Sequence, residues 1–130
     1  MTCQIDAFNP ANMTTPFGAY HQAVTVSGAS RWLLISGQLG LDAANQLTGG
    51  IEAQANQAFA NIDQCLGHAG MTRANIVKLS SFLTSRALRG AYMQVRDGWV
   101  VEPWPASTLL FVPELAVEGA LIEIEAIAVA

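Results

Sequence analysis

Two carboxylates lie close together on the last apolar segment of the chain, Glu123 and Glu125 in the run from Leu121 to Val129. Alternate residues of a β-strand point to the same face, so both glutamates share a face with Ile127 and Val129. A solvated face would stay polar along its length, so we expect this strand to run from a semi-polar cavity or a subunit edge into the core. Such carboxylates are used for chemistry, held by hydrogen bonds, or are ordinary edge charges, and the pattern leaves these alternatives open.

The other residue types that could do chemistry are too widely spaced to form a site by pattern alone. His21 and His68 are far apart, and neither has a Cys or Asp at a metal-ligand spacing. Cys3 and Cys65 are too few for a disulfide framework, and we expect reduced thiols. The sequence therefore predicts no metal site and no cofactor.

The charge balance argues against a nucleic-acid partner. The formal net charge is −4, and the basic residues are scattered: Arg31, Arg73, Lys78, Arg86, Arg89 and Arg96. Binding to a phosphate backbone needs a clustered basic surface. No apolar run reaches the 18 or more residues of a membrane span, and the N-terminus lacks the basic start of a signal peptide. We therefore expect a cytoplasmic protein with no membrane or nucleic-acid partner.

Hydrophobic periodicity divides the chain into strands and helices. The pattern predicts strands at residues 19–26, 32–38, 76–83, 107–112 and 121–129, and helices at residues 51–69 and 86–99. The turn signal at residues 27–30 predicts that the first two strands form a hairpin. The order of these elements predicts a single α+β domain over residues 1–130, with two helices packed on one face of one sheet.

The amount of apolar surface exceeds what a domain of this size can bury alone. Hydrophobic residues make up 52% of the chain and charged residues only 12%, about half the usual share. The second face of the predicted sheet is also apolar, and no further element is left to cover it. We therefore expect copies of the chain to cover that face.

Several segments, taken in order, resemble the reactive-intermediate deaminase family (RidA/YjgF), from about residue 16 to the end. The segments are Gly18-Ala19-Tyr20-His21-Gln22, Ser36-Gly37-Gln38, Ala53-Gln54-Ala55 with Asn61, Ala69-Gly70, Ile76-Val77-Lys78, Pro105-Ala106-Ser107-Thr108 and residues 122–128. The resemblance implies a chorismate-mutase-like fold with a mixed sheet of about six strands. It further implies a homotrimer, a small-molecule cleft at each subunit interface, and hydrolysis of imines and enamines.

The resemblance also implies roles for individual residues. Tyr20 matches a cleft tyrosine that orients a substrate or a water, and Glu123 matches a glutamate proposed to hold or activate a water near the imine carbon. Gly37 matches a position where the backbone lies against the ligand. Trp104 stands where the family has an aromatic residue that could wall the cleft. Each also has an ordinary structural interpretation, as a packed aromatic, a hydrogen-bond partner or a strand-end bulge.

One departure from the family lies at Ser107. Family members that deaminate 2-imino acids carry an arginine there, which binds the substrate carboxylate, and a hydroxyl cannot form that bidentate clamp. Loss of one partner of such a pair costs about 2–5 kcal/mol, or roughly 30- to 4000-fold. No other arginine lies in a segment that could obviously replace it, and Arg31 or Arg73 from a neighbouring copy remain candidates. From sequence, Ser107→Arg is expected to restore the clamp.

Three functions from different classes remain. The first is hydrolysis of an imine or enamine without a 2-carboxylate, with Glu123 and Tyr20 as the catalytic residues and Ser107, Gly37 and Trp104 as binding residues. The second is a non-catalytic trimer that binds or senses a small ligand. The third, a ribonuclease or translation inhibitor, is disfavoured by the acidic composition.

Overall fold

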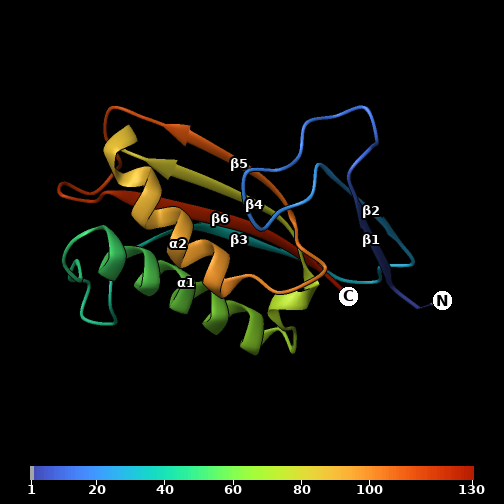
Figure 1. Ribbon diagram of the computed structural model, residues 1–130. Coiled ribbons are helices and arrows are strands. Elements are labelled where there is room, and N and C mark those ends of the chain that lie inside the picture. The colour runs from blue at the N-terminus through green and yellow to red at the C-terminus, as the bar shows by residue number, and fades with distance from the viewer. Residues whose placement is uncertain (1) are drawn as a thin grey trace.

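A four-stranded mixed sheet forms the centre of the fold in the computed structural model, which describes residues 2–130 (Figure 1). The strand order is β3-β6-β4-β5, and the strands are β3 (Trp32–Leu39), β4 (Ile76–Leu83), β5 (Ala106–Phe111) and β6 (Ile122–Val129). Strand β6 is antiparallel to both β3 and β4, whereas β5 runs parallel to β4. β5 is therefore an edge strand.

The first two strands form a separate antiparallel ribbon, β1 (Gln4–Phe8) with β2 (Ala23–Ser27). The predicted hairpin between residues 19–26 and 32–38 is therefore wrong. β3 pairs with β6 instead, and Ser30 and Arg31 both donate backbone hydrogen bonds to the Ala130 carbonyl at 2.9 Å. The turn at residues 28–31 carries the chain from one sheet to the other, because β6 offers β3 a longer apolar partner than β2 does.

Two helices cover one face of the central sheet, as predicted (Figure 1). They are α1 (Ile51–His68) and α2 (Arg89–Trp99), and two short 3₁₀ turns, η1 (Arg73–Asn75) and η2 (Arg86–Leu88), precede β4 and α2. The apolar stripe of α1 is buried, and Phe59 stacks on Trp99 of α2 with ring centroids 4.4 Å apart. The α+β class and the six strands of the described chain confirm the prediction, although the strands divide into a sheet of four and a ribbon of two.

Two polar residues of α1 hold loops rather than a ligand. Gln54, only 2% exposed, accepts from the Leu121 backbone N–H at 2.8 Å and donates to the Gly49 carbonyl at 2.8 Å. The Asn61 amide donates to the carbonyls of Leu39 and Leu41 at 3.2 and 3.0 Å. Satisfied amides of this kind, buried for Gln54 and half-buried for Asn61, fix the loop conformations.

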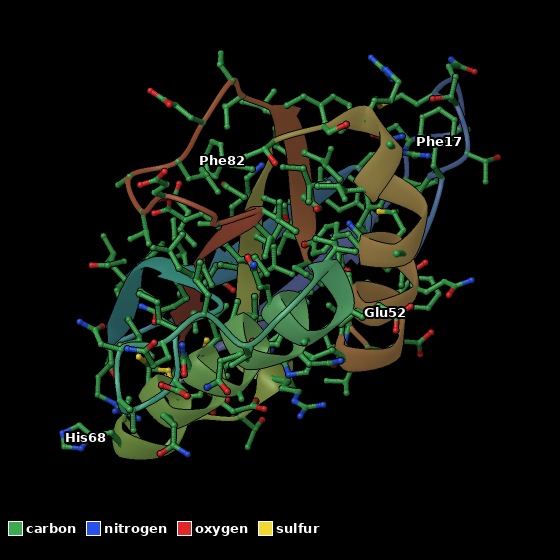
Figure 2. All side chains as sticks on the ribbon, turned by 90° about the vertical axis from the view of Figure 1, so that its left-hand side faces the viewer. Phe17, Glu52, His68 and Phe82 are labelled. Atoms are coloured by element: carbon green, nitrogen blue, oxygen red, sulfur yellow. The ribbon has the colours of Figure 1, made fainter. Side chains whose placement is uncertain are left out.

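The two faces of the sheet differ in what covers them. The β6 side chains that pack under the helices are buried, namely Ile122, Ile124, Ala126 and Ala128. The opposite face, which we call the open face, carries Glu123, Glu125 and Ile127, together with the exposed Trp32, Leu34 and Leu110. Figure 2 shows Phe82 projecting on the side of the sheet away from α2. The open face is uncovered in the single chain, and it is apolar only in part, because Glu123 and Glu125 lie among its apolar side chains.

No helix in residues 2–130 has the length and apolarity needed to cross a membrane.

Candidate functional site

Tyr20 and Ser107 line one pocket of about 230 Å³ beside α2. The pocket lies between α2, the edge strand β5 and the loop that precedes β2, and its lining residues are Phe17, Tyr20, Arg89, Met93, Arg96, Ser107, Leu109 and Phe111. Phe17 stands at the edge of the molecule beside α2 (Figure 2). Two of the residues predicted from sequence are therefore brought together, from segments nearly ninety positions apart.

The start of β5 holds the segment that carries Tyr20. His21 forms an isolated parallel bridge with Ala106, and its backbone N–H donates to the Pro105 carbonyl at 3.0 Å. The His21 ring donates from Nδ1 to the Trp104 carbonyl, also at 3.0 Å. Because His21 is fixed to the residues just before Ser107, its neighbour Tyr20 is placed at the pocket. His21 is thus a structural residue.

Helix α2 fixes the same segment from the other side. The Ala19 backbone N–H donates to Asp97 Oδ1 at 3.2 Å. A Cβ atom on Gly18 would lie 2.9 Å from Arg96 Nη2 and 2.9 Å from Met93 Cε, so only glycine permits this approach without a shift of the helix side chains. The Tyr20 hydroxyl accepts from the Phe17 backbone N–H at 3.1 Å, which leaves its own proton free to be donated.

A buried arginine lies against Ser107. Arg96 is 2% exposed, and its Nη1 donates to Ser107 Oγ at 2.9 Å. Its Nε and Nη2 donate to Asp97 Oδ1 at 3.2 and 3.0 Å, and its guanidinium carbon lies 5.3 Å from the centre of the Tyr20 ring. These contacts stabilise the charge by an ion pair and by a cation–π interaction. Arg96 therefore links Tyr20 and Ser107 into one assembly.

A second arginine, Arg89, lines the same pocket from the first turn of α2 and is half-buried. The ion pairs of the described residues are Arg73–Asp63 and Arg96–Asp97, so Arg89 has no acidic partner in that part of the chain. No acidic side chain of residues 2–130 lines the pocket. Within the described chain the pocket lining therefore includes two arginines and no carboxylate, and Asp97 beside it pairs with one of them.

The sequence showed no arginine in a segment that could obviously replace the missing one, and it did not single out Arg96, which contacts Ser107. Arg31 donates to the Ala69 carbonyl, and Arg73 pairs with Asp63 at 2.8 Å, so neither approaches Ser107 within the chain. Arg96 does. A signal was present in the sequence, because Arg96 follows Tyr92 by four positions and precedes Trp99 by three on the predicted helix. It therefore falls inside the apolar stripe, where arginine is rarely buried without a partner.

Glu123 and Gly37 lie together, away from this pocket. The Glu123 carboxylate rests directly against Gly37, so a Cβ atom at position 37 would collide with it. Glu123 is half-buried and pairs in register with Leu39 of β3 and Phe82 of β4. The exposed Glu125 lines a hollow of about 310 Å³ on the open face with Lys78 and Ser80.

Glu123 and Ser107 point to opposite faces of the sheet. Ser107 is in register with Leu79, which is in register with the buried Ala126, so Ser107 faces the helices. Glu123 is three positions from Ala126 and projects to the open face. Within one chain, therefore, Glu123 does not join Tyr20 and Ser107. The glutamate reaches the pocket only if it comes from another copy.

Trp104 does not line the pocket. It is half-buried against the hydrophobic core, and its ring lies 5.8 Å from the His21 ring. This contact supports the His21 anchor, so within the chain Trp104 positions Tyr20 indirectly and does not wall the pocket.

A buried hydroxyl pair lies one turn before Arg96. The Tyr92 hydroxyl is hydrogen-bonded to Ser81 Oγ, and Tyr92 is fully buried. Burial raises the pKa of Tyr92 to about 12, an effect that the Ser81 hydrogen bond and the nearby Arg96 charge partly offset. Tyr92 is therefore a neutral structural group at physiological pH. No cluster of three or more potential metal-ligating His, Cys, Asp or Glu side chains occurs in residues 2–130.

Comparison with known proteins identifies the family. Residues 11–130 match the family described as endoribonuclease L-PSP. A RutC family protein of Aquifex aeolicus is 36% identical over 117 residues, covering 88% of this chain and 90% of that protein. A 2-iminobutanoate/2-iminopropanoate deaminase of Capra hircus is 38% identical over 121 residues, covering 92% and 85%. The chain belongs to the endoribonuclease L-PSP (RidA/YjgF) family.

Similarity to solved structures supports the same family assignment. The Rid-family protein YyfB of Yersinia pestis, described as of unknown function, superposes with a TM-score of 0.87 at 32% identity, covering 97% of this chain and 98% of that one. RidA of an Antarctic Psychrobacter superposes with a TM-score of 0.73 at 32% identity, covering 96% and 99%. The similarity extends over nearly the whole chain, so the fold described above is that of the family.

Proposed function

We propose that this protein hydrolyses a small imine or enamine in a cleft built by two copies of the chain. The observation that carries the proposal is the joint placement of Tyr20, Ser107 and Arg96 in one pocket at an edge strand. The deaminase names of relatives at about 37% identity support the reaction class.

The proposed assembly is a homotrimer, in which the open face of one copy meets a neighbour. Leu34 and Trp32 are 73% and 60% exposed in the single chain, and burial of such side chains is strongly favourable. Glu123 projects from this same face. The neighbouring copy would then supply Glu123, with Gly37 beneath it, to the pocket that holds Tyr20.

The reaction needs no cofactor. Water adds through its oxygen to the carbon of the C=N bond, the nitrogen takes up protons, and ammonia leaves as the carbonyl forms. Glu123 of the neighbouring copy would accept a proton from the attacking water, and the free hydroxyl proton of Tyr20 would hydrogen-bond the substrate. Ser107 is not a nucleophile in this scheme, because its oxygen accepts from a guanidinium and lacks a general base beside it in the described chain.

The sequence favoured a substrate without a 2-carboxylate, because no cation was expected near Ser107. Arg89 and Arg96 now stand in that pocket, so the proposal includes anionic as well as neutral imines. A non-catalytic ligand-binding trimer is the alternative, and turnover decides between the two. A nucleic-acid substrate remains disfavoured despite the family description, because the net charge is −4 and only six residues are basic.

A test generates 2-iminopropanoate and a neutral imine in situ and follows ammonia release above the uncatalysed rate. We expect wild-type protein to accelerate at least one of the two, and Glu123→Gln to remove most of that acceleration while the protein stays folded and assembled. Absence of acceleration with both imines would favour the ligand-binding alternative.

A further inference from the structure

We propose that α2, rather than β5, supplies the positive charge that binds the anionic group of the ligand, through Arg89 and Arg96. This inference rests on the proposed function for its substrate, and it names a small carboxylate as the group that is recognised. In this proposal Arg89 and Arg96 determine the specificity of the pocket. Ser107 is the residue that positions the Arg96 guanidinium.

The first step of the argument is the place of Arg96. Its Nη1 lies 2.9 Å from Ser107 Oγ, so the guanidinium stands immediately beyond the short side chain of position 107. A longer side chain on β5 would run into it. The short side chain of Ser107 on β5 thus leaves room for the Arg96 guanidinium, which extends from α2.

The second step concerns the N–H donors of Arg96 that have no protein acceptor. A guanidinium has five N–H donors. Protein acceptors in residues 2–130 engage one on Nε, one on Nη1 and one on Nη2. Two donors, one on each terminal nitrogen, have no acceptor within residues 2–130, and because Arg96 is only 2% exposed they can meet a ligand only at the closed end of the pocket. A planar fork of this kind suits the two oxygens of a carboxylate.

The third step is the charge balance of the pocket. Asp97 contacts Arg96 through Nε and Nη2 and neutralises one positive charge. Arg89 lines the pocket and has no acidic partner within residues 2–130, so the pocket of the single chain keeps about one positive charge, before the Glu123 carboxylate of a neighbouring copy is added. Two of the six basic residues of a chain with net charge −4 thus gather at one pocket.

The size of the pocket restricts the anion. The volume is about 230 Å³, below the roughly 300–1,000 Å³ of pockets for drug-sized ligands. The apolar Phe17, Leu109 and Phe111 provide the remaining wall. These features suit a carboxylate on a short carbon chain, and they do not suit a nucleotide or a polyanion.

The experiment measures binding to the assembled protein, separately from turnover. The probes are pyruvate, the carbonyl product expected of 2-iminopropanoate, and its neutral amide, pyruvamide, titrated by calorimetry or by protein-observed NMR. Wild-type protein should bind pyruvate more tightly than pyruvamide. Arg89→Gln should weaken pyruvate binding about 10- to 150-fold, the effect of one charge-assisted hydrogen bond, and leave pyruvamide binding unchanged.

Arg86→Gln is the matched control. It removes the same charge three positions earlier, where the exposed Arg86 lies over the ring of Phe111, a wall residue, but does not itself line the pocket. Its pyruvate affinity should fall far less than that of Arg89→Gln. Arg96→Lys keeps the charge but not the planar fork and should also weaken pyruvate binding, and if that buried substitution prevents folding, Arg89→Gln decides alone.

Three outcomes would overturn the inference: equal affinity of the wild type for pyruvate and pyruvamide, equal losses in Arg89→Gln and Arg86→Gln, or tighter binding of inorganic phosphate than of pyruvate. A protein that hydrolyses a neutral imine but fails the pyruvate test keeps the proposed function and loses this inference. A protein that binds pyruvate through Arg89 but hydrolyses nothing keeps the anion site and loses the proposed function.

Discussion

Arg96 Nη1 donates a hydrogen bond to Ser107 Oγ across 2.9 Å, joining helix α2 to the edge strand β5. This contact changes the interpretation of Ser107. The family resemblance implies an arginine at that position, and the serine alone suggests a lost charge. In the folded chain a guanidinium contacts the serine from a different element, helix α2, and is paired with Asp97.

The first prediction is that Ser107→Arg does not create a carboxylate clamp. The new guanidinium would meet that of Arg96, and two like charges about 4 Å apart repel by up to roughly 4 kcal/mol at the dielectric of a protein surface. We expect a less stable protein and no gain in 2-iminopropanoate hydrolysis, which reverses the expectation from sequence. Urea unfolding and ammonia release measure the two effects.

Ser107→Gln is the control for that substitution, since it adds length without charge. If the two variants lose the same stability, the effect is one of volume. A rise in 2-iminopropanoate turnover in a well-folded Ser107→Arg protein would instead show that Arg96 does not occupy the anion site.

The second prediction concerns Gly37 and Glu123. A methyl group at position 37 would collide with the Glu123 carboxylate, so Gly37→Ala should displace it. A displacement of about 1 Å costs roughly 100-fold in rate where a group is catalytic. The kcat for whichever imine is hydrolysed should therefore fall about 100-fold, and Glu123→Gln should lower kcat while the free energy of unfolding changes little.

Gly67→Ala is the matched control, because a Cβ atom there meets nothing within 4 Å and Gly67 lies inside α1. That variant should keep wild-type kcat and gain about 0.5–1 kcal/mol of stability, as Gly→Ala does inside a helix. A fully active Gly37→Ala protein would remove Glu123 from the mechanism.

The sequence predicted the helices and the four central strands well because their apolar periods are strong. The pairing of β2 was missed because short apolar segments joined by a turn signal favour a hairpin, whereas the choice of partner depends on β6, about a hundred residues further on. Only the family resemblance suggested that Tyr20 and Ser107 belong to one site, and both line the same pocket. No local pattern shows that His21 fixes this segment to the start of β5.

Arg96 illustrates a different limit. The helical period puts it on the buried face, but the period alone does not tell which strand residue it meets. Ser107 becomes its partner because β5 is parallel to β4 and lies at the sheet edge next to α2. Side-chain pairs between a helix and a strand depend on tertiary packing, so they follow from the fold and not from spacing.

The third prediction tests the open face. Light scattering coupled to size exclusion should give about three times the chain mass of 13.8 kDa. Leu34, 73% exposed in the single chain, would be buried in such an assembly. Leu34→Glu should therefore give monomers at micromolar concentration, because an unpaired charge cannot leave water without a large cost.

Val101→Glu is the matched control for Leu34→Glu. Val101 is 40% exposed and lines a hollow with residues of α1 and η1, on the side of the sheet that carries the helices. The variant should keep the wild-type mass. A monomeric wild-type protein, or a Leu34→Glu protein of unchanged mass, would mean that this face does not form the assembly.

The last prediction follows from Tyr92, whose burial raises its pKa to about 12 from an ordinary 10. Between those values the unfolded chain releases the phenol proton while the folded protein keeps it, so the folded state binds more protons and the free energy of unfolding falls as pH rises. The contribution is present below pH 10 and is lost toward pH 12, at about 1.4 kcal/mol per pH unit. Tyr92→Phe removes the hydrogen bond to Ser81, at a cost of about 1 kcal/mol. Between pH 9.5 and 11.5 the urea midpoint of this variant should decline less steeply with pH than that of the wild type. Parallel declines in the two proteins would show that Tyr92 titrates normally and is reached by water.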